Sequence, residues 1–276
     1  MIGAAIQRLY HALVPLSVRR KLRVSRYTAS RRARATLWRQ TGGRVAAGPF
    51  KSLRLAGDTP DDCYGAALLG SYECETHEWL ERQFARGWNA VVNVGSDTGY
   101  YSTGTALRLP QATVYAFEMI DAKRAETARS AERNGVGSRV KALGLADPAA
   151  LAALPVTEAL VICDCEGYEA VVLDPAAVPW LARSAMLVEL HDFAVPGATE
   201  TVRSRFATTH DIAIVQQRPR DPAQWARLAN ISINAAKELS SELRPWGDLH
   251  VDGQWMLLTP RLSASADQGF DRVQSR

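Results

Sequence analysis

Short apolar runs alternate with amphipathic stretches along most of the chain from residue 88 onward. A run of apolar and β-branched residues predicts a buried strand, and apolar residues repeated every three or four positions predict a helix. Strands are predicted at residues 90–94, 113–118, 139–143, 160–164, 186–190, 212–216 and 255–259. Helices are predicted at residues 101–109, 121–134, just after 147, 171–181 and 201–207. Strands separated by helices of this length indicate parallel βαβ units, so we expect an α/β sheet with helices on both faces.

Two further segments border this pattern. In residues 58–87 aromatic side chains such as Trp79 and Phe84 lie among acidic ones, which predicts an entrance helix or lid across the carboxyl edge of the sheet. Residues 218–252 match no pattern that indicates a fold or a function. We expect residues 88–262 to form the main domain and residues 263–276 to form a C-terminal tail.

The charges of the chain are unevenly distributed. Residues 1–57 hold 13 of the 33 Lys and Arg residues and none of the 29 Asp and Glu residues, so this leader carries +13 and the rest carries −9. Apolar residues recur at helical spacing from Ile2 to Leu13, before Pro15, and an arginine-rich stretch follows. A basic, partly helical leader of this kind is typical of a segment that lies on an anionic membrane, and we expect peripheral contact through residues 1–44.

Other interpretations of the leader stay open. Blocks of one charge sign are often solvated, partly disordered tails, and an Arg-rich, acid-free start also resembles an organellar transit peptide. Nucleic acid is not expected as a partner, because the arginines are not interleaved with stacking aromatic residues and the domain that follows is acidic.

Composition limits the class of protein. With 47% apolar and 22% charged residues the chain can build a globular core, and no apolar run approaches the roughly 18 residues that a membrane-spanning helix needs. The four cysteines have neither the number of a disulfide framework nor the spacing of a zinc site. We therefore expect a cytoplasmic protein that can lie at the inner face of the membrane.

A glycine-rich turn follows the first predicted strand and opens a helix. Gly95 and Gly99 bracket this turn, and glycine allows a ligand to approach the backbone closely. Glu118 ends the next strand, 19 residues after Gly99, where a carboxylate can accept hydrogen bonds from both hydroxyl groups of a ribose. The turn and the carboxylate together indicate a nucleotide site.

The turn also carries Asp97. A carboxylate there would repel the pyrophosphate of a dinucleotide, whereas it would attract S-adenosylmethionine, which carries a sulfonium and an ammonium group and no phosphate. An NAD-linked oxidoreductase is therefore disfavoured, and S-adenosylmethionine is the expected cofactor. The residues expected to bind it are Asn93, Gly95, Ser96, Asp97, Thr98, Gly99, Tyr100, Glu118, Met119, Ala146 and Asp164.

A second motif, Asp164-Cys165-Glu166-Gly167-Tyr168-Glu169, follows the fourth predicted strand. Together with the glycine turn it resembles the FkbM family of class I methyltransferases, whose turn usually reads Asp-Val-Gly-Ala-Asn-x-Gly and whose fourth strand usually ends Asp-x-Glu-Gly-x-Glu. The resemblance covers residues 88–193 most clearly. It implies a Rossmann-like sandwich with a mostly parallel seven-stranded sheet, and O-methylation of an acceptor hydroxyl.

The sequence departs from the family at two positions. Asn93 stands where Asp is usual, and Met119 stands where many members have Pro. Asn93 keeps an acceptor for the ammonium group of the cofactor but gives up the charge, and we expect Asp97 to take over that role.

Methyl transfer from a sulfonium is a direct displacement, so the protein must align the reactants and remove a proton from the acceptor. His191 has the solution pKa best suited to act as the base, and Asp164 and Glu166 are the other expected catalytic residues. Glu166 and Glu169 could equally cap the helix that follows. The acidic groups and His191 at the ends of these strands, Glu189 and Asp192 included, could also hold a magnesium or calcium ion, although we do not expect a metal.

Cys163 and Cys165 flank Asp164, and we expect them to pack into helices on opposite faces of the sheet. Zinc binding through them is not expected, because the chain has no second paired motif.

These observations predict an S-adenosylmethionine-dependent O-methyltransferase that acts on a hydroxyl of a saccharide or glycoconjugate, or less readily of a polyketide-like small molecule. The alternative is a noncatalytic partner protein with a methyltransferase fold, recruited through its basic leader. Asn93 is the feature that favours the alternative.

Overall fold

The computed structural model describes residues 16–240 and 253–261, with side chains from residue 28 onward. The chain divides into two compact units, one formed by Met1–Tyr72 with Pro219–Gly247 and the other by Glu73–Arg218 with Asp248–Arg276. The amphipathic helix expected before Pro15 and the tail expected at residues 263–276 lie outside the described residues.

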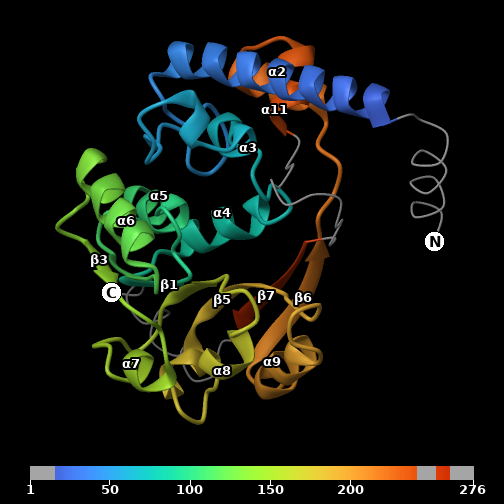
Figure 1. Ribbon diagram of the computed structural model, residues 1–276. Helices are drawn as coiled ribbons and strands as arrows, with labels where there is room; N and C mark the ends of the chain where they lie inside the picture. Colours follow the sequence, from blue (N-terminus) through green and yellow to red (C-terminus); the bar gives the residue numbers. More distant parts are fainter. Residues whose placement is uncertain (1–15, 241–252, 262–276) are drawn as a thin grey trace, which may run out of the picture. The chain divides into compact units, whose positions relative to one another are not determined.

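The second unit is built on a seven-stranded sheet with the order β3-β2-β1-β4-β5-β7-β6 (Figure 1). Neighbouring strands among β1 to β5 are parallel, and β7 runs antiparallel to β5 and to β6. The strands are β1 (Ala90–Val94), β2 (Thr113–Phe117), β3 (Val140–Leu143), β4 (Leu160–Cys163), β5 (Ala185–Glu189), β6 (His210–Gln216) and β7 (Gln254–Pro260). All seven predicted strands are confirmed, with ends that differ from the prediction by at most two residues.

Helices cover both faces of this sheet. Its helical elements are α4 (His77–Arg86), α5 (Tyr100–Arg108), α6 (Asp121–Arg133), α7 (Pro148–Ala152), α8 (Glu169–Val172), the 3₁₀ helix η2 (Pro179–Arg183) and α9 (Ala198–Phe206). Helices α4, α5 and α6 lie on one face, and α7, α8 and α9 lie on the other (Figure 1). The mostly parallel seven-stranded sheet with two helical layers confirms the expected Rossmann-like α/β sandwich.

The core follows the alternation of side chains along the strands. Val92, Val161 and Val188 point to one face, where they pack in one apolar cluster with Val172 of α8 and Phe206 of α9. Parallel strands are buried on both faces, which explains why β1, β4 and β5 are apolar except at Asn93 and Glu189 and are recognisable as short runs in the sequence.

The strand register determines where a site can form. Val94 pairs with Phe117 on one side and with Cys163 on the other, and Cys163 pairs with Val188. The segments that follow β1, β2, β4 and β5 therefore leave the sheet at the same edge, which is where ligands bind in open α/β sheets.

Two predicted helices are interrupted in the structure. The stretch at 171–181 forms α8 and η2, separated by a turn at Asp174, because the proline that follows Asp174 disfavours helical geometry in the residue before it. The expected entrance helix or lid at 58–87 is not one helix, because this stretch contains α3 (Gly65–Leu69) in the first unit and α4 in the second. Helix α3 ends at Gly70, which has φ +87 and whose Cβ would lie 1.9 Å from the carbonyl oxygen of Ala47.

The first unit joins the leader to the segment that the sequence left unassigned. It contains α2 (Leu16–Thr41), the 3₁₀ helix η1 (Pro60–Asp62), α3, α10 (Pro222–Ala229) and α11 (Ile233–Ser240). Leu37, Val45 and Leu53 of the leader are each at most 2% exposed. The described part of the leader that contains these residues is folded, so it is not a solvated tail.

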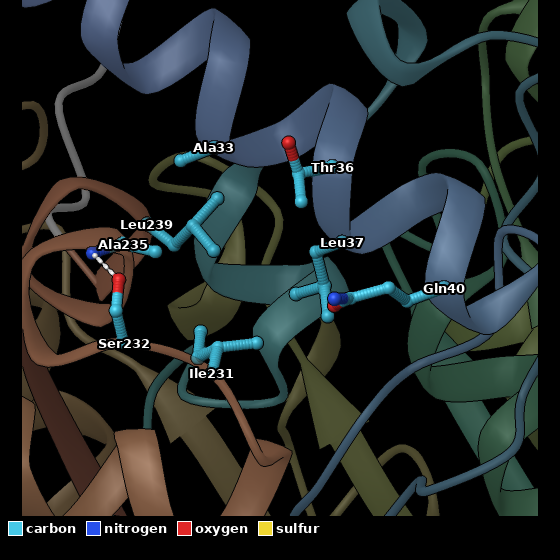
Figure 2. A pocket seen from close by; sticks show the side chains of 8 residues that line it. All are labelled: Ala33, Thr36, Leu37, Gln40, Ile231, Ser232, Ala235 and Leu239. Atoms are coloured by element: carbon cyan, nitrogen blue, oxygen red, sulfur yellow. Dashed lines mark hydrogen bonds between the residues drawn. The ribbon is translucent and has the colours of Figure 1, made fainter.

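A small pocket of about 100 Å³ lies within this unit, between α2 and the segment that leads into α11 (Figure 2). The side chains that line it are Ala33, Thr36, Leu37, Gln40, Ile231, Ser232, Ala235 and Leu239. None of these eight residues carries a charge or a strong nucleophile, and pockets that hold a cofactor are several times larger. The pocket is therefore a packing defect and not a candidate site.

In the part of the chain that the structure describes, every helix is either too short or too polar to span a bilayer.

One buried histidine gives the second unit a pH-dependent stability. His210 is 1% exposed, its Nε2 lies 2.7 Å from the carbonyl oxygen of Ser184, and its Nδ1 lies 2.8 Å from the hydroxyl of Thr209. Burial lowers the pKa of His210, and the hydrogen bond to Ser184 only partly offsets it. A neutral ring satisfies both contacts, donating to Ser184 and accepting from Thr209.

Because the unfolded chain binds this proton more readily than the folded chain, the free energy of unfolding should fall as the pH drops below about 6.5. We expect urea denaturation to show a larger loss between about pH 7.5 and about pH 5.5 for the wild type than for His210→Gln, which keeps a donor and an acceptor but does not titrate. Equal losses in the two proteins would contradict this assignment.

Candidate functional site

The turn after β1 is held against two neighbouring strands. The N–H groups of Gly95 and Ser96 both donate to the carbonyl of Phe117, each at 2.9 Å. Gly95 has φ +78, and a Cβ atom there would lie 1.6 Å from the carbonyl oxygen of Asp164. Glycine is therefore required at this position, and the turn passes directly beside the end of β4.

Glu118 lies at the end of β2 with 8% of its surface exposed. Its Oε2 accepts a hydrogen bond from the N–H of Asp97 at 3.1 Å, and its Oε1 accepts one from the N–H of Ile120 at 2.8 Å. An ionised carboxylate has about four acceptor positions. The turn thus fixes the orientation of Glu118 and leaves capacity for the two hydroxyl groups of a ribose.

Asp97, which we expected to attract the cationic cofactor, is paired with a lysine of the protein instead. Its Oδ1 lies 2.6 Å from Nζ of Lys123 on α6, and both side chains are about half exposed. Lys123 neutralises the carboxylate, so the charge of Asp97 no longer discriminates strongly between a cationic cofactor and a pyrophosphate. Asp97 also has φ +46, and its backbone carbonyl accepts a hydrogen bond from Thr127 at 2.8 Å, which indicates a role in shaping the turn.

Asn93 is 1% exposed, and both ends of its side-chain amide are hydrogen-bonded within the protein. Its Oδ1 accepts a hydrogen bond from Ser102 at 2.6 Å, and its Nδ2 donates to the carbonyl of Ile162 at 3.2 Å. An aspartate could not make the second bond. The departure from the family pattern therefore lets Asn93 bridge β1 and β4, and its oxygen already has a partner other than a cofactor.

The other expected cofactor residues lie around the same turn. Ser96 is buried and its hydroxyl lies 3.2 Å from that of Thr127. Gly99 has φ +90, and Thr98 and Tyr100 beside it are half-buried. Ala146, after β3, is buried, whereas Met119, after β2, is 69% exposed. Met119 and the neighbouring half-exposed Ile120 offer an apolar surface next to Glu118.

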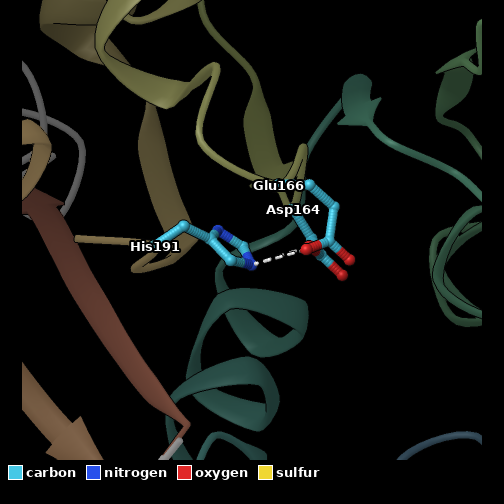
Figure 3. Close-up of side chains that lie close together, drawn as sticks. All are labelled: Asp164, Glu166 and His191. Carbon is cyan, nitrogen blue, oxygen red and sulfur yellow. Dashed lines mark ion pairs between the residues drawn. The ribbon is translucent and has the colours of Figure 1, made fainter. Parts of the chain in front are cut away.

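A second group of side chains gathers at the ends of β4 and β5. Asp164, Glu166 and His191 point toward one another (Figure 3), and one ligand-type atom from each lies within 4.8 Å of the others. His191 Nε2 is 3.5 Å from Oε2 of Glu166 and 3.7 Å from Oδ1 of Asp164. The three residues expected to be catalytic are thus brought together.

Glu169 holds the other side of the His191 ring. Its Oε1 lies 2.7 Å from His191 Nδ1, and both side chains are 2% exposed. The same oxygen accepts hydrogen bonds from the N–H groups of Cys165 and Gly167 at 3.3 and 3.2 Å. The sequence suggested only a helix cap for Glu169, so its pairing with His191 was missed. Its position inside the conspicuous six-residue motif was the available signal.

Burial and neighbouring charges shift the pKa values of this cluster. Burial, together with the charge of Glu189, raises the pKa of Asp164 well above its usual range. Burial alone would lower the pKa of His191, but the hydrogen bond to Glu169 and the charges of nearby carboxylates raise it overall. Burial alone would raise the pKa of Glu169, but its hydrogen bond with His191 lowers this pKa overall. The cluster is therefore rich in negative charge and attracts protons or cations.

Asp192 and Tyr101 complete the description of this edge. Asp192 accepts hydrogen bonds from the N–H groups of Gly197 and Thr199, at 2.9 and 3.3 Å, so it stabilises the start of α9 and does not face His191. Tyr101 donates a short hydrogen bond to Glu73, which is buried. The sequence did not single out this pair, because the two residues lie far apart in the chain.

The expected placement of Cys163 and Cys165 on opposite faces is wrong. Their sulfur atoms are 3.6 Å apart. Residues two apart in an extended segment point to the same face, and only Asp164 between them points to the other. The hydrogen bond with Cys165 and burial raise the pKa of the Cys163 thiol.

A scan against protein-family models gave no match to the sequence, and a search of curated protein sequences gave none either. Among solved structures, the chain is similar to a putative O-methyltransferase from Klebsiella pneumoniae, with 13% identity, a TM-score of 0.43 and coverage of 94% of this chain and 97% of that one.

Two further similar structures were solved with a ligand. The O-methyltransferase TomG from Streptomyces achromogenes, in complex with SAM, has 14% identity, a TM-score of 0.41 and coverage of 83% of this chain and 89% of that one. An O-methyltransferase from Bacillus cereus, in complex with SAH, has 11% identity, a TM-score of 0.43 and coverage of 68% and 81%. At identities this low, function must be argued from the residues of this chain.

The close contact at Gly95 can be tested against a matched glycine. Gly135 has a similar φ of +72 but no atom within 4 Å of an added Cβ. We expect Gly135→Ala to cost about 1–2 kcal/mol of stability through its backbone conformation, and Gly95→Ala to cost about 4 kcal/mol or more, because the methyl group also collides with Asp164. Thermal and urea denaturation measure both values, and equal losses would show that the turn can move away from β4.

Proposed function

We propose that the chain is an S-adenosylmethionine-dependent methyltransferase that acts on a hydroxyl group. The observation that carries this proposal is the position of Glu118. Its carboxylate is fixed by the N–H groups of Asp97 and Ile120 beside a turn without bulky side chains, and the His191 cluster follows neighbouring strands at the same edge of the sheet.

The residues at this edge fit the cofactor. Glu118 would accept hydrogen bonds from the hydroxyl groups of the ribose, and Gly95 and Gly99 would let the cofactor approach the main chain. Met119 and Ile120 would contact the adenine with their exposed apolar surfaces. The carboxylates at the ends of β4 and β5 would balance the positive charge of the sulfonium and ammonium groups. S-adenosylmethionine supplies the activated methyl group.

The role of the protein in the reaction is then to place and activate the acceptor. A hydroxyl attacks a methyl group well only when it is aligned with it and loses its proton during the transfer. Asp164, Glu166 and His191 form the polar cluster suited to this task, and Glu169 fixes the ring of His191 so that Nε2 faces the other two.

For the acceptor we propose a saccharide or glycoconjugate hydroxyl, as the resemblance to the FkbM family implies. A cluster of carboxylates can accept hydrogen bonds from several hydroxyl groups at once, which supports a polyhydroxy acceptor. The solved structures similar to this chain include O-methyltransferases, which is compatible with a hydroxyl acceptor.

Neither alternative function has an observation in its favour. Asn93 was the feature that favoured a noncatalytic partner, and its hydrogen bonds to Ser102 and Ile162 explain it without a loss of activity. The carboxylate of Asp97 was the argument against an NAD-linked enzyme, and its ion pair with Lys123 weakens that argument. The antiparallel β7 between β5 and β6 nevertheless differs from the strand order 3-2-1-4-5-6 of dinucleotide-binding sheets.

Contact of the leader with an anionic membrane stays a prediction. Arg32 and Arg39 on α2 are exposed, and the leader holds no acidic residue. We expect the full chain to sediment with anionic vesicles at low salt and the double variant Arg32→Gln, Arg39→Gln to sediment less. Absence of sedimentation of the wild type would exclude the membrane as a partner.

The cofactor site is tested by calorimetry with S-adenosylmethionine. We expect binding by the wild type and roughly 10- to 100-fold weaker binding by Glu118→Gln, which keeps an acceptor for the Asp97 N–H but loses the charge that strengthens bonds to the ribose hydroxyls. Glu200→Gln, at a side chain that is 74% exposed on α9, is the control and should bind like the wild type. Lack of binding by the wild type, or equal binding by all three proteins, would refute the site.

A further inference from the structure

Three ligand-type atoms at the ends of β4 and β5 converge on one point. His191 Nε2 lies 3.7 Å from Oδ1 of Asp164 and 3.5 Å from Oε2 of Glu166. These distances are too long for direct hydrogen bonds. Two atoms that each lie roughly 2.0–2.3 Å from a common metal ion are separated by about this amount. The distances from His191 Nε2 to the two carboxylate oxygens are therefore compatible with ligands of one ion, and the three atoms all lie within 4.8 Å of one another.

The most buried of these atoms lacks a partner. His191 is 2% exposed, and its Nε2 has no hydrogen-bond partner among the described residues. The atom that it faces, Oδ1 of Asp164, is also buried and has none within the same part of the chain. Buried polar atoms without partners are rare in folded proteins, and each requires an explanation such as a bound ion.

The opposite side of the imidazole is arranged as it is in metal sites. Glu169 Oε1 lies 2.7 Å from His191 Nδ1, and a carboxylate on one ring nitrogen is the usual partner of a histidine that binds a metal through the other. With a proton held on Nδ1, the lone pair of Nε2 points at Asp164 and Glu166, as Figure 3 shows for the side chains.

Charge favours a cation at the same point. Four carboxylates lie within 4 Å of the His191 ring nitrogens, at 2.7 Å for Glu169, 3.5 Å for Glu166, 3.7 Å for Asp164 and 3.9 Å for Glu189. An imidazole that binds a metal through Nε2 is neutral and balances none of them. A divalent ion between Asp164, Glu166 and His191 would compensate two negative charges and would replace the proton that the high pKa of Asp164 otherwise retains.

We propose that Asp164, Glu166 and His191 bind a divalent transition-metal ion, with Glu169 as the positioning residue behind His191. One imidazole and two carboxylates suit manganese, iron or cobalt better than magnesium or calcium, which prefer oxygen ligands alone. The role of the ion rests on the proposed function, in which it would orient and polarise the acceptor hydroxyl. His191 would then act as a ligand and not as a free base.

The test uses the full chain after removal of metals with a chelator. Mn²⁺ is titrated into the protein by calorimetry, and the electron paramagnetic resonance signal of free Mn²⁺ is followed in parallel. We expect one ion per chain for the wild type and at least about 10-fold weaker binding for Glu166→Gln and for His191→Gln. Glu166→Gln should fold normally, because the Glu166 side chain is 72% exposed. Glu200→Gln is the control and should bind Mn²⁺ like the wild type.

Addition of Co²⁺ identifies the histidine ligand. The visible absorption of bound Co²⁺ should differ between the wild type and His191→Gln, because a nitrogen ligand is lost. The proposal is overturned if the wild type binds no Mn²⁺ stoichiometrically, or if neither substitution at the cluster weakens binding. S-adenosylmethionine binding to the same metal-free sample is measured separately. Cofactor binding without Mn²⁺ binding removes only this proposal, and the reverse result removes only the proposed function.

Discussion

The contact between Gly95 and the main chain of Asp164 is the constraint on which the site depends. The N–H of Asp164 donates to the carbonyl of Val94 at 2.9 Å, and Gly95 follows so closely that no side chain fits between the two segments. This contact fixes the glycine turn, and with it Glu118, relative to the motif that begins at Asp164. The proposed cofactor site at Glu118 and the His191 cluster are thereby held at the same edge of the sheet.

The electrostatics of that edge follow from the same geometry. Parallel strands end together, so acidic residues placed after β4 and β5 cannot avoid one another. Glu169 and His191 form one compensated pair, but Asp164, Glu166 and Glu189 remain close to the same ring. Such an arrangement is unfavourable without added positive charge. A cationic cofactor or a divalent ion would each reduce the repulsion between these carboxylates. The excess of carboxylates at this edge would therefore favour the binding of positively charged ligands.

The sequence predicted the fold well because the signals were local. Strands such as 90–94 and 160–164 are buried on both faces and are therefore mostly apolar, and the segments between them are short. The entrance segment expected at 58–87 was wrong as one helix, because the approach of Gly70 to Ala47, which ends α3, depends on contacts distant in sequence. The folded part of the leader was also hidden, because α11, which lines one pocket together with α2, lies far along the chain at Ile233–Ser240.

The site shows the same division between local and distant signals. The glycine turn, Glu118 and the Asp164–Glu169 motif were identifiable from residue types and spacing. The pairing of Asp97 with Lys123 was not identifiable, because Lys123 lies on α6 after the next strand, and neither was the pairing of Glu169 with His191, which follow different strands. The most direct test of the account is a crystal structure of the chain with S-adenosylhomocysteine. We predict the ribose hydroxyls on the carboxylate of Glu118 and the sulfur on the side of the His191 cluster, whereas a ligand bound elsewhere, or with its ribose away from Glu118, would contradict the account.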